Sequence, residues 1–426
     1  MAADVLVIGA GVAGMKASLL LASAGRRVHL IENSSIIGGR LIRCEDIFPA
    51  MECATCMVSP MQQDVLRNDL INVVTLGDIL SIEGSIGNFR VKIRKRASCV
   101  DPVACIGCAE CWNACPVEIN NEFEENLSKR KAISIPCAGA LPNVPWIDRE
   151  NCLRWNGDEN CSLCAEACVF AAVDYSEVDS EFEITVSNII LSTGYQPTHG
   201  EVFEKYQWGI CPGVFTASEF ERYYSSNGPT SGELVTKDGL KPESAAIIVH
   251  ACGTGSHSNI NTMYSLKFLH YLMEKLPDIR PVVFLDASYS PDALEDRHHL
   301  KWRNVEADVI LYTQIPEVNK VGDGKSLSIT CSTAEGSFQA ETDLLVLGTS
   351  MLPSTGTSKF IKLLGIECSD EGYVTKPEPG LSSVMTTVPG IFAAGCTGGP
   401  LDIASSVTEA AAAVGRVLAD ANRGEK

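Results

Sequence analysis

The chain has 426 residues, of which 45% are hydrophobic and 20% charged, so it can bury a sizeable core and is neither a disordered nor a disulfide-stapled polypeptide. Its 34 basic and 53 acidic residues leave a formal charge of −19, which disfavours nucleic acid and anionic membrane surfaces as partners because both are bound through Lys and Arg. The length predicts two or three domains of roughly 150 residues, and the composition includes eighteen cysteines that need a chemical explanation.

The first residues show no export signal, since an acid stands at Asp4 and no basic segment precedes the apolar run. Lys16 and four glycines within residues 3–25 argue against a membrane span in the same stretch. We therefore expect a cytoplasmic protein in a reducing compartment, where clustered thiols bind metal in place of forming disulfides.

The N-terminal segment predicts a dinucleotide-binding unit. An apolar run over residues 4–9 is typical of a parallel strand buried on both faces, and it leads through a G-x-G-x-x-G motif into a helical pattern over 15–24. Glycines at this spacing allow a tight turn, close approach of a pyrophosphate and close packing of helix on strand. A second strand over 27–31 ends at an acid whose carboxylate can accept hydrogen bonds from the ribose hydroxyls. The predicted cofactor residues are Gly9, Gly11, Gly14 and Glu32.

Three cysteines follow this unit, and their role stays open between three interpretations. Cys53 and Cys56 form a C-x2-C pair, preceded by Cys44. One interpretation is a redox dithiol formed by Cys53 and Cys56 that faces the cofactor. Another is a third iron-sulfur cluster, for which Cys396 would supply the fourth ligand through space. The remaining interpretation is inert packing.

Eight of the cysteines within residues 97–176 have the spacing of a two-cluster ferredoxin. The first run, over 105–115, reads C-x2-C-x2-C-x3-C-P, in which three thiolates hold one [4Fe-4S] cluster and the fourth reaches a neighbouring one. The second run, over 152–168, reads C-x8-C-x2-C-x3-C. The predicted ligands are therefore crossed: Cys105, Cys108, Cys111 and Cys168 for cluster one, and Cys152, Cys161, Cys164 and Cys115 for cluster two. Zinc is the alternative, although zinc ribbons favour paired C-x2-C knuckles.

Residues 244–350 predict a second α/β unit. Its expected elements are strands over 245–249, 281–286 and 343–348 and a helix over 263–275. Ser258 stands where the third glycine of a dinucleotide motif belongs, so we expect this unit to serve in docking and cofactor cover more than in nicotinamide binding.

Several segments resemble FAD-binding flavoproteins that contain two dinucleotide-binding domains. Besides the N-terminal motif they are a loop after Glu32, a strand and turn over 189–195, and a C-terminal motif over 390–403 that precedes a helix over 405–421. The resemblance implies FAD as the cofactor and adds these binding residues: Gly38, Gly39, Arg40, Thr193, Gly194, Gly395, Asp402 and Ile403. The implied domains are an FAD domain in three pieces, 1–96, 177–243 (with a linker) and 351–426, a ferredoxin-like insertion, 97–176, and the second α/β unit, 244–350.

The combination resembles the A subunit of heterodisulfide reductase and its relatives, which include the A subunit of the quinone-interacting membrane-bound oxidoreductase. The resemblance implies an α/β, thioredoxin-reductase-like flavoprotein with an inserted two-cluster bacterial ferredoxin-like domain. It further implies an oxidoreductase subunit that passes electrons between FAD and [4Fe-4S] clusters to partner subunits, in some relatives with flavin-based bifurcation.

The partners implied by the resemblance are other iron-sulfur subunits, such as B- and C-like heterodisulfide reductase subunits, or quinone-reactive membrane subunits that would place the chain at the periphery of the inner membrane. The alternative function is a stand-alone NAD(P)H-dependent FAD disulfide reductase that uses Cys53 and Cys56.

Overall fold

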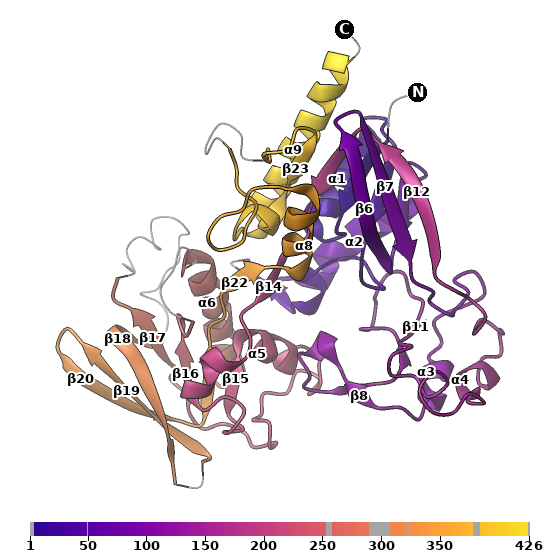
Figure 1. Ribbon diagram of the computed structural model, residues 1–426. Helices are drawn as coiled ribbons and strands as arrows, with labels where there is room; N and C mark the ends of the chain where they lie inside the picture. Colours follow the sequence, from indigo (N-terminus) through magenta and orange to yellow (C-terminus); the bar gives the residue numbers. More distant parts are fainter. Residues whose placement is uncertain are drawn as a thin grey trace. The chain divides into compact units, whose positions relative to one another are not determined.

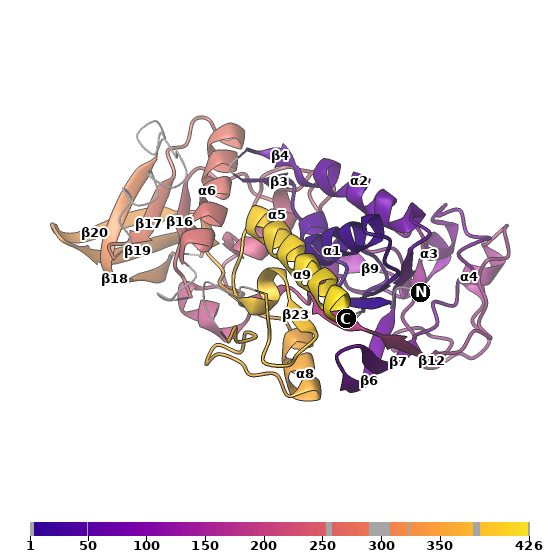
Figure 2. The ribbon, with the colours of Figure 1, turned by 90° about the horizontal axis from the view of Figure 1, so that it is seen from above.

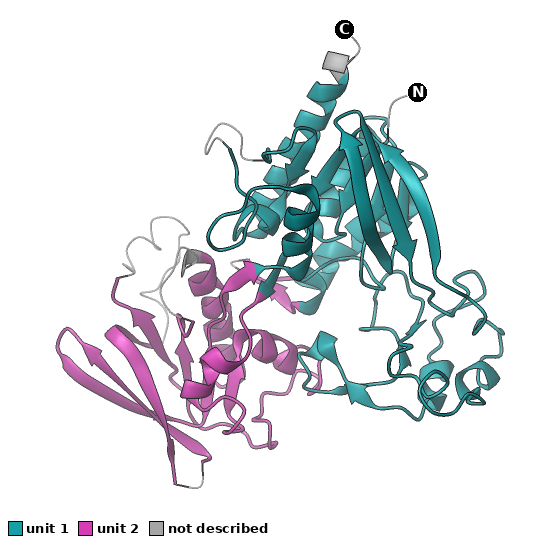
Figure 3. Cartoon of the chain, in the orientation of Figure 1, with its two compact units in different colours: residues 1–43, 54–196, 353–426 teal, residues 44–53, 197–352 magenta. Residues whose placement is uncertain are grey.

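The computed structural model describes residues 4–48, 50–252, 258–288, 307–322, 324–377 and 384–424. The chain divides into two compact units (Figure 3). The first comprises residues 1–43, 54–196 and 353–426, and the second comprises residues 44–53 and 197–352. Each unit is organised by its own sheet, which is parallel in the first unit and mixed in the second.

The first unit is built on a five-stranded parallel sheet in the order β23-β13-β1-β2-β5. The strands are β1 (Val5–Ile8), β2 (Val28–Ile31), β5 (Ile71–Val74), β13 (Asn188–Leu191) and β23 (Ile391–Ala393). All four residues of β1 and of β13 are buried, as expected for central strands covered on both faces. Residues from both ends of the chain therefore form one sheet.

Helix α1 (Val12–Ser23) and helix α9 (Ile403–Gly424) pack side by side on this sheet, and α2 (Ala54–Arg67) lies next to α1 (Figures 1 and 2). Small residues make the α1–α9 contact, since Ala17 on α1 and Ala410 and Ala413 on α9 are fully buried. Their short side chains allow the two backbones to approach closely. Helix α8 (Thr355–Leu364) and two short 3-10 helices, η1 (Leu41–Arg43) and η5 (Gly395–Gly398), complete this part.

An antiparallel sheet in the order β12-β7-β6 carries the insertion. Its strands are β6 (Gly77–Ser85), β7 (Asn88–Lys95) and β12 (Ser180–Val186). Phe89, Val91 and Ile93 alternate along β7 and face the core. The chain leaves the sheet after Lys95 and returns at Ser180, and these two residues are paired neighbours. An insertion here therefore begins and ends at one place without disturbing the sheet.

The inserted residues form short elements around a core rich in cysteine. They are α3 (Glu110–Ala114), α4 (Leu163–Glu166), η2 (Glu122–Glu124), and the strand pairs β8 (Ile119–Asn120) with β9 (Lys129–Arg130) and β10 (Ile133–Ser134) with β11 (Trp146–Ile147). An isolated antiparallel bridge joins Val100 to Val173. The insertion also packs into the core beside the five-stranded sheet, since Phe123 and Ala140 belong to the same hydrophobic cluster as Ile37.

The second unit is built on a seven-stranded sheet in the order β15-β21-β16-β17-β18-β19-β20. The strands are β15 (Val214–Thr216), β16 (Ala245–Ile248), β17 (Val282–Asp286), β18 (Asp308–Val321), β19 (Ser326–Thr333), β20 (Gly336–Thr342) and β21 (Leu344–Leu347). The first five in the order are parallel, and β18 to β20 form an antiparallel meander. Helices α5 (Ala217–Tyr224) and α6 (Ser258–Lys275) and the 3-10 helix η3 (Glu201–Tyr206) belong to this unit.

The division into units differs from the ranges expected from the sequence at two places. The hairpin of β3 (Asp46–Ile47) and β4 (Glu52–Cys53) belongs to the second unit, although it was expected within the FAD domain. Phe48 and Met51 pack on the core of the second unit, which explains this. Residues 197–243 also belong there, and the chain passes between the units in β14 (Tyr195–Pro197) and β22 (Met351–Pro353).

The expected helices exist with shifted ends. The pattern over 15–24 corresponds to α1 (Val12–Ser23), the pattern over 405–421 to α9 (Ile403–Gly424), and the pattern over 263–275 to α6 (Ser258–Lys275). Within the described part of the chain, no helix combines the length and apolarity needed to cross a bilayer.

Candidate cofactor sites

The predicted FAD residues gather at one edge of the five-stranded sheet. Gly9 follows β1, Glu32 follows β2, Thr193 follows β13 by two residues, and Gly395 follows β23 by two residues. Since these strands are parallel and adjacent, their carboxyl ends meet at the same edge, which is where open α/β sheets bind nucleotides.

Two of the motif glycines are required by the backbone. Gly9 has φ +99°, and a Cβ there would lie 2.3 Å from the carbonyl oxygen of Ser192. A Cβ on Gly14 would lie 1.9 Å from the carbonyl oxygen of Gly9. Gly11 is the N-cap of α1 and has no side chain to bond the first N–H groups. Gly39 packs next to Gly11, since a Cβ added to Gly11 would lie 3.8 Å from the Cα of Gly39. No N-cap side chain therefore bonds the first N–H groups of α1, which are the groups that bind a phosphate in dinucleotide-binding motifs.

The carboxylate of Glu32 is held at this edge by donors on both oxygens. Its Oε2 accepts a hydrogen bond of 2.8 Å from the backbone N–H of Ala10, inside the glycine motif. Its Oε1 accepts from the backbone N–H and the hydroxyl of Ser34, at 2.8 and 2.9 Å. The acid is therefore preorganised beside the glycine turn.

On the other side of the edge, Thr193 Oγ1 lies 2.6 Å from Thr357 Oγ1 and 3.2 Å from Thr397 Oγ1. This link joins the turn after β13 to the start of α8 and to η5. Sequence motifs identified Thr193 but neither of its threonine partners, because their proximity depends on the fold.

The remaining predicted FAD residues also lie in the first unit. Asp402 precedes Ile403, the first residue of α9, and its Oδ1 accepts from the backbone N–H of Ser405 at 2.7 Å. Asp402 is thus an N-cap that stabilises the end of the helix. The guanidinium of Arg40 lies 5.5 Å from the ring centroid of Tyr195, the residue that follows Gly194. Arg40 Nη1 also lies 3.5 Å from Glu125 Oε1 in the insertion. The insertion therefore reaches the loop that contains Gly38 and Gly39.

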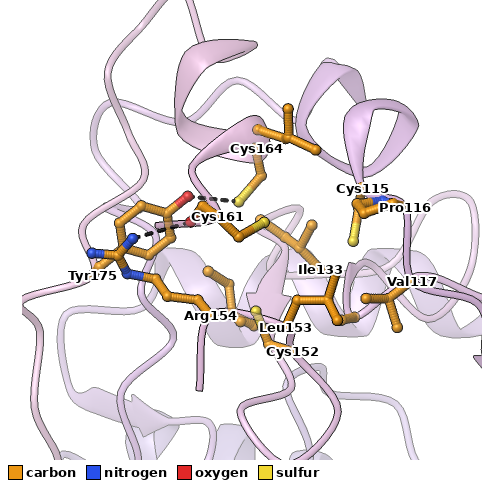
Figure 4. A pocket seen from close by; sticks show the side chains of 13 residues that line it. Cys115, Pro116, Val117, Ile133, Cys152, Leu153, Arg154, Cys161, Cys164 and Tyr175 are labelled. Carbon is orange, nitrogen blue, oxygen red and sulfur yellow. Dashed lines mark hydrogen bonds between the residues drawn. The ribbon is translucent and has the colours of Figure 1, made fainter. Parts of the chain in front are cut away.

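Two pockets in the insertion are each lined by four cysteines. The first pocket is lined by Cys105, Cys108, Cys111 and Cys168. The second pocket is lined by Cys115, Cys152, Cys161 and Cys164 (Figure 4). Each pocket combines three cysteines of one run with the last cysteine of the other. The side chains are grouped in the crossed pattern, while their role as cluster ligands stays a prediction.

The local structure explains the crossing of the first run. Cys111 lies in α3, and the helix ends at Ala114. Cys115 is extended, with φ −71° and ψ 125°, as the following Pro116 favours. The helix therefore ends before Cys115, the last cysteine of the first run, and Cys115 lines the second pocket with Cys152 and Cys164.

The chemistry of both pockets fits an iron-sulfur cluster, which is held by cysteine thiolates. Besides the cysteines, apolar side chains such as Val100 and Val173 line one pocket and Ile133 and Ile147 line the other. Burial and the neighbouring Cys105 raise the pKa of Cys111 to about 12. Crowded thiols of this kind ionise when a metal compensates the charge. In the described residues, no three His, Cys, Asp or Glu side chains are placed to hold a single metal ion.

The second pocket has polar neighbours that the cysteine spacing did not reveal. Tyr175 OH lies 3.0 Å from Cys164 Sγ, and Arg154 Nη1 donates to the carbonyl oxygen of Cys161 at 3.0 Å (Figure 4). Burial raises the pKa of Cys152 and of Cys164 above the ordinary thiol value. The sequence shows that Tyr175 closely follows the second cysteine run, but the contact of its hydroxyl with Cys164 depends on the fold.

The four cysteines named for a third cluster are divided between the units. Cys44 and Cys53 belong to the second unit, and Cys56 and Cys396 to the first. Cys53 and Cys56 are exposed, whereas burial raises the pKa of Cys396, whose Sγ lies 3.5 Å from the carbonyl oxygen of Leu401. All three interpretations of this group, the dithiol, the cluster and inert packing, stay predictions. Residues 253–257, next to the Ser258 turn, lie outside the described residues.

Comparison with known proteins gives a consistent result. Residues 4–53 match the family described as FAD dependent oxidoreductase. Thioredoxin reductases of Lactococcus lactis and T. acidophilum share the fold, each with a TM-score of 0.52, at 14% and 15% identity over 99% and 98% of both chains. The chain thus has the two-domain fold of thioredoxin-reductase-like flavoproteins.

The sequence relatives extend over the whole chain. It is 34% identical to an iron-sulfur A subunit of the CoB–CoM heterodisulfide reductase of Methanopyrus kandleri, over 99% of the chain and 64% of the relative. It is 32% identical to the iron-sulfur A subunit of the corresponding reductase of Methanocaldococcus jannaschii, over 97% of the chain and 63% of the relative. The chain spans just under two thirds of the length of these relatives. In sequence, the chain is thus similar to the A subunits of heterodisulfide reductases over almost its whole length.

Proposed function

We propose that the chain is an FAD- and [4Fe-4S]-containing electron-transfer subunit of a heterodisulfide reductase-like oxidoreductase complex. The observation that carries the proposal is the pair of pockets, each lined by four cysteines, in the same unit as the nucleotide-binding edge. The names of the relatives, which describe iron-sulfur subunits, support it. When bound, FAD exchanges two electrons and each cluster one, so a chain that holds both can divide electron pairs.

The residues of the chain would bind and orient these groups. The glycines of the N-terminal motif would admit the pyrophosphate, and Glu32 would orient the ribose. Cys105, Cys108, Cys111 and Cys168 would hold one cluster, and Cys115, Cys152, Cys161 and Cys164 the other.

The contact between the insertion and the flavoprotein part supports transfer between the two cofactor types. The backbone N–H of Ile37, next to Gly38, donates to the carbonyl oxygen of Leu141 in the insertion at 2.8 Å. Arg43 Nη1 lies 3.0 Å from Glu125 Oε1. These bonds fix the inserted residues against the predicted FAD loop.

We further propose that partner redox subunits donate and accept the electrons, in the cytoplasm, and that any membrane attachment comes from those partners. A relative from Methanothermobacter thermautotrophicus, 30% identical, is named as the A subunit of an "H(2):CoB-CoM heterodisulfide,ferredoxin reductase". Flavin-based bifurcation belongs to this proposal as the property to be tested on the assembled complex.

The test is to measure iron, acid-labile sulfide, zinc and flavin per chain after anaerobic isolation together with co-purifying proteins. One FAD with about eight irons and eight sulfides is expected. About twelve irons would assign Cys44, Cys53, Cys56 and Cys396 to a third cluster. Zinc in place of iron, or absence of flavin, would contradict the proposal.

The alternative, an NAD(P)H-dependent disulfide reductase using Cys53 and Cys56, is decided on the same preparation. Bleaching of the flavin by NADH or NADPH alone, coupled to reduction of a small disulfide and lost in Cys53→Ser, would favour it. Reduction that requires a co-purified partner and survives Cys53→Ser supports the role in electron transfer.

A further inference from the structure

The two cysteine pockets differ in the groups that surround their sulfur atoms. Of the described residues, only backbone N–H groups donate to sulfur in the first pocket: Gly107 N lies 3.4 Å from Cys105 Sγ, and Ala172 N lies 3.3 Å from Cys168 Sγ. The side chains that line this pocket besides the cysteines are apolar and uncharged, among them Phe170. A reduced cluster there would have no side-chain donor among these residues.

The second pocket contains a hydroxyl and a cation. Tyr175 OH lies 3.0 Å from Cys164 Sγ, and the guanidinium carbon of Arg154 lies 4.2 Å from the ring centroid of Tyr175 (Figure 4). When Cys164 is a cluster ligand its sulfur carries no proton, so the hydroxyl must be the donor. The sulfur of a ligand cysteine then accepts a hydrogen bond from an oriented side chain.

The surroundings of Tyr175 hold it in this position. The preceding residues are fixed to the start of the insertion, since Val173 bridges Val100 and the backbone N–H of Asp174 donates to the carbonyl oxygen of Cys99 at 3.0 Å. The ring of Trp155 packs edge-on against Tyr175, with 6.1 Å between centroids. Two segments therefore position Tyr175: residues 99–100 hold the backbone before it and Trp155 packs on its ring, so the hydrogen bond costs little reorganisation.

We infer that Tyr175 and Arg154 set the reduction potential of the second cluster above that of the first. This inference rests on the proposed function. Reduction adds one negative charge to a cluster and its sulfur ligands, so a hydrogen-bond donor and a nearby cation stabilise the reduced form more than the oxidised form. The described lining of the first pocket lacks both kinds of group. With both clusters bound, one electron would pass from a reduced first cluster to an oxidised second cluster, so the second cluster would hold the electron at equilibrium.

The test is a potentiometric titration of the anaerobically isolated full chain, followed by electron paramagnetic resonance. Two midpoint potentials are expected, and Cys164→Ser identifies the signal of the second cluster by changing its line shape. Tyr175→Phe, which keeps the ring, should lower that potential by about 59 mV, the equivalent of a tenfold change for a one-electron couple. The first cluster and the flavin should keep their potentials.

Two further variants separate the hydroxyl from general packing. Trp155→Phe keeps an aromatic ring against Tyr175 and leaves the Tyr175 hydroxyl in place, so both potentials should stay within the error of the titration. Arg154→Gln should lower the same potential as Tyr175→Phe. Unchanged midpoint potentials in Tyr175→Phe and Arg154→Gln, at full iron content, would overturn the inference. Equal shifts of the potentials of both clusters in these variants would also overturn it. A wild-type chain without iron would instead contradict the proposed function itself.

Discussion

At the scale of single residues, the glycines of the nucleotide motif show how the backbone imposes a residue type. The carbonyl oxygen of Gly9 occupies the place that a Cβ on Gly14 would need, at 1.9 Å, and this oxygen is part of a turn and cannot move aside. The requirement comes from the close packing of α1 on the end of β1.

Gly14→Ala is therefore expected to abolish flavin binding and to destabilise the first unit. The matched control is Gly415→Ala on α9, where an added Cβ has no heavy atom within 4 Å. The control should retain flavin and gain about 1 kcal/mol in unfolding free energy, because Ala favours the helix over Gly. Flavin absorbance after gel filtration and urea unfolding measure both effects, and flavin retained by Gly14→Ala would refute this account of the turn.

At the scale of elements, one prediction concerns how the β3–β4 hairpin is held in the second unit. Lys267 on α6 forms a buried ion pair with Glu221 on α5, with exposed side-chain fractions of 2% and 3%. Lys267 also donates to the carbonyl oxygen of Asp46, and Glu221 accepts from the backbone N–H of Glu45 at 2.9 Å. The pair therefore connects the two helices to the hairpin that contains Cys53.

Lys267→Met should lower the free energy of unfolding of the second unit by about 3–5 kcal/mol, because Glu221 would be left charged and buried. The double variant Lys267→Met, Glu221→Leu should recover part of this loss. Lys92 with Glu181 is the control pair, since both are about half exposed (48% and 44%) and removal of either should cost less than about 1 kcal/mol. A loss in the control equal to that of Lys267→Met would show that burial is not the cause.

A second prediction at this scale concerns the contact of α8 with the antiparallel sheet. Burial alone would raise the pKa of Asp78 on β6, but Lys359 on α8 and Arg94 on β7 lower it below its ordinary value. A lowered folded-state pKa adds stability above the unfolded-state pKa, and this is lost as the pH falls through the folded-state value. Asp78→Asn should be less stable than wild type at pH 7, and the difference should vanish in acid. A difference that stays constant down to pH 2 would contradict the prediction.

At the scale of the whole molecule, we expect the insertion to depend on its predicted clusters, because predicted ligand cysteines form a large part of its core. Cys111, Cys115, Cys152 and Cys164 are buried members of the hydrophobic cluster of the insertion. Removal of iron and sulfide should therefore open residues 97–176, while the five-stranded sheet keeps its own core.

Limited proteolysis after chelation should then cut within residues 97–176 and leave the rest of the first unit intact. The holoprotein under the same conditions is the control and should resist cleavage there. Equal cleavage before and after chelation would show that the insertion is folded by its apolar residues alone.

Residue spacing determined the local features of this protein. The glycine motif, the acid after the second strand, the Cys-Pro run and the apolar strands each depend on neighbours within about twenty residues. They were sufficient to predict a nucleotide-binding edge and two cysteine runs, whereas the thioredoxin-reductase-like fold, which the solved structures share, was implied by the family resemblance. Helix ends were less certain because capping depends on local backbone geometry, as the start of α9 after Asp402 illustrates.

Only the tertiary structure decided the contacts between segments far apart in the chain. The β3–β4 hairpin joins the second unit through Phe48, and Tyr175 meets Cys164 in one pocket but no equivalent hydroxyl enters the other in the described residues. Such contacts follow from packing of whole elements against one another. Sequence spacing does not predict these contacts, because the free energy that selects them is gained only when the elements meet.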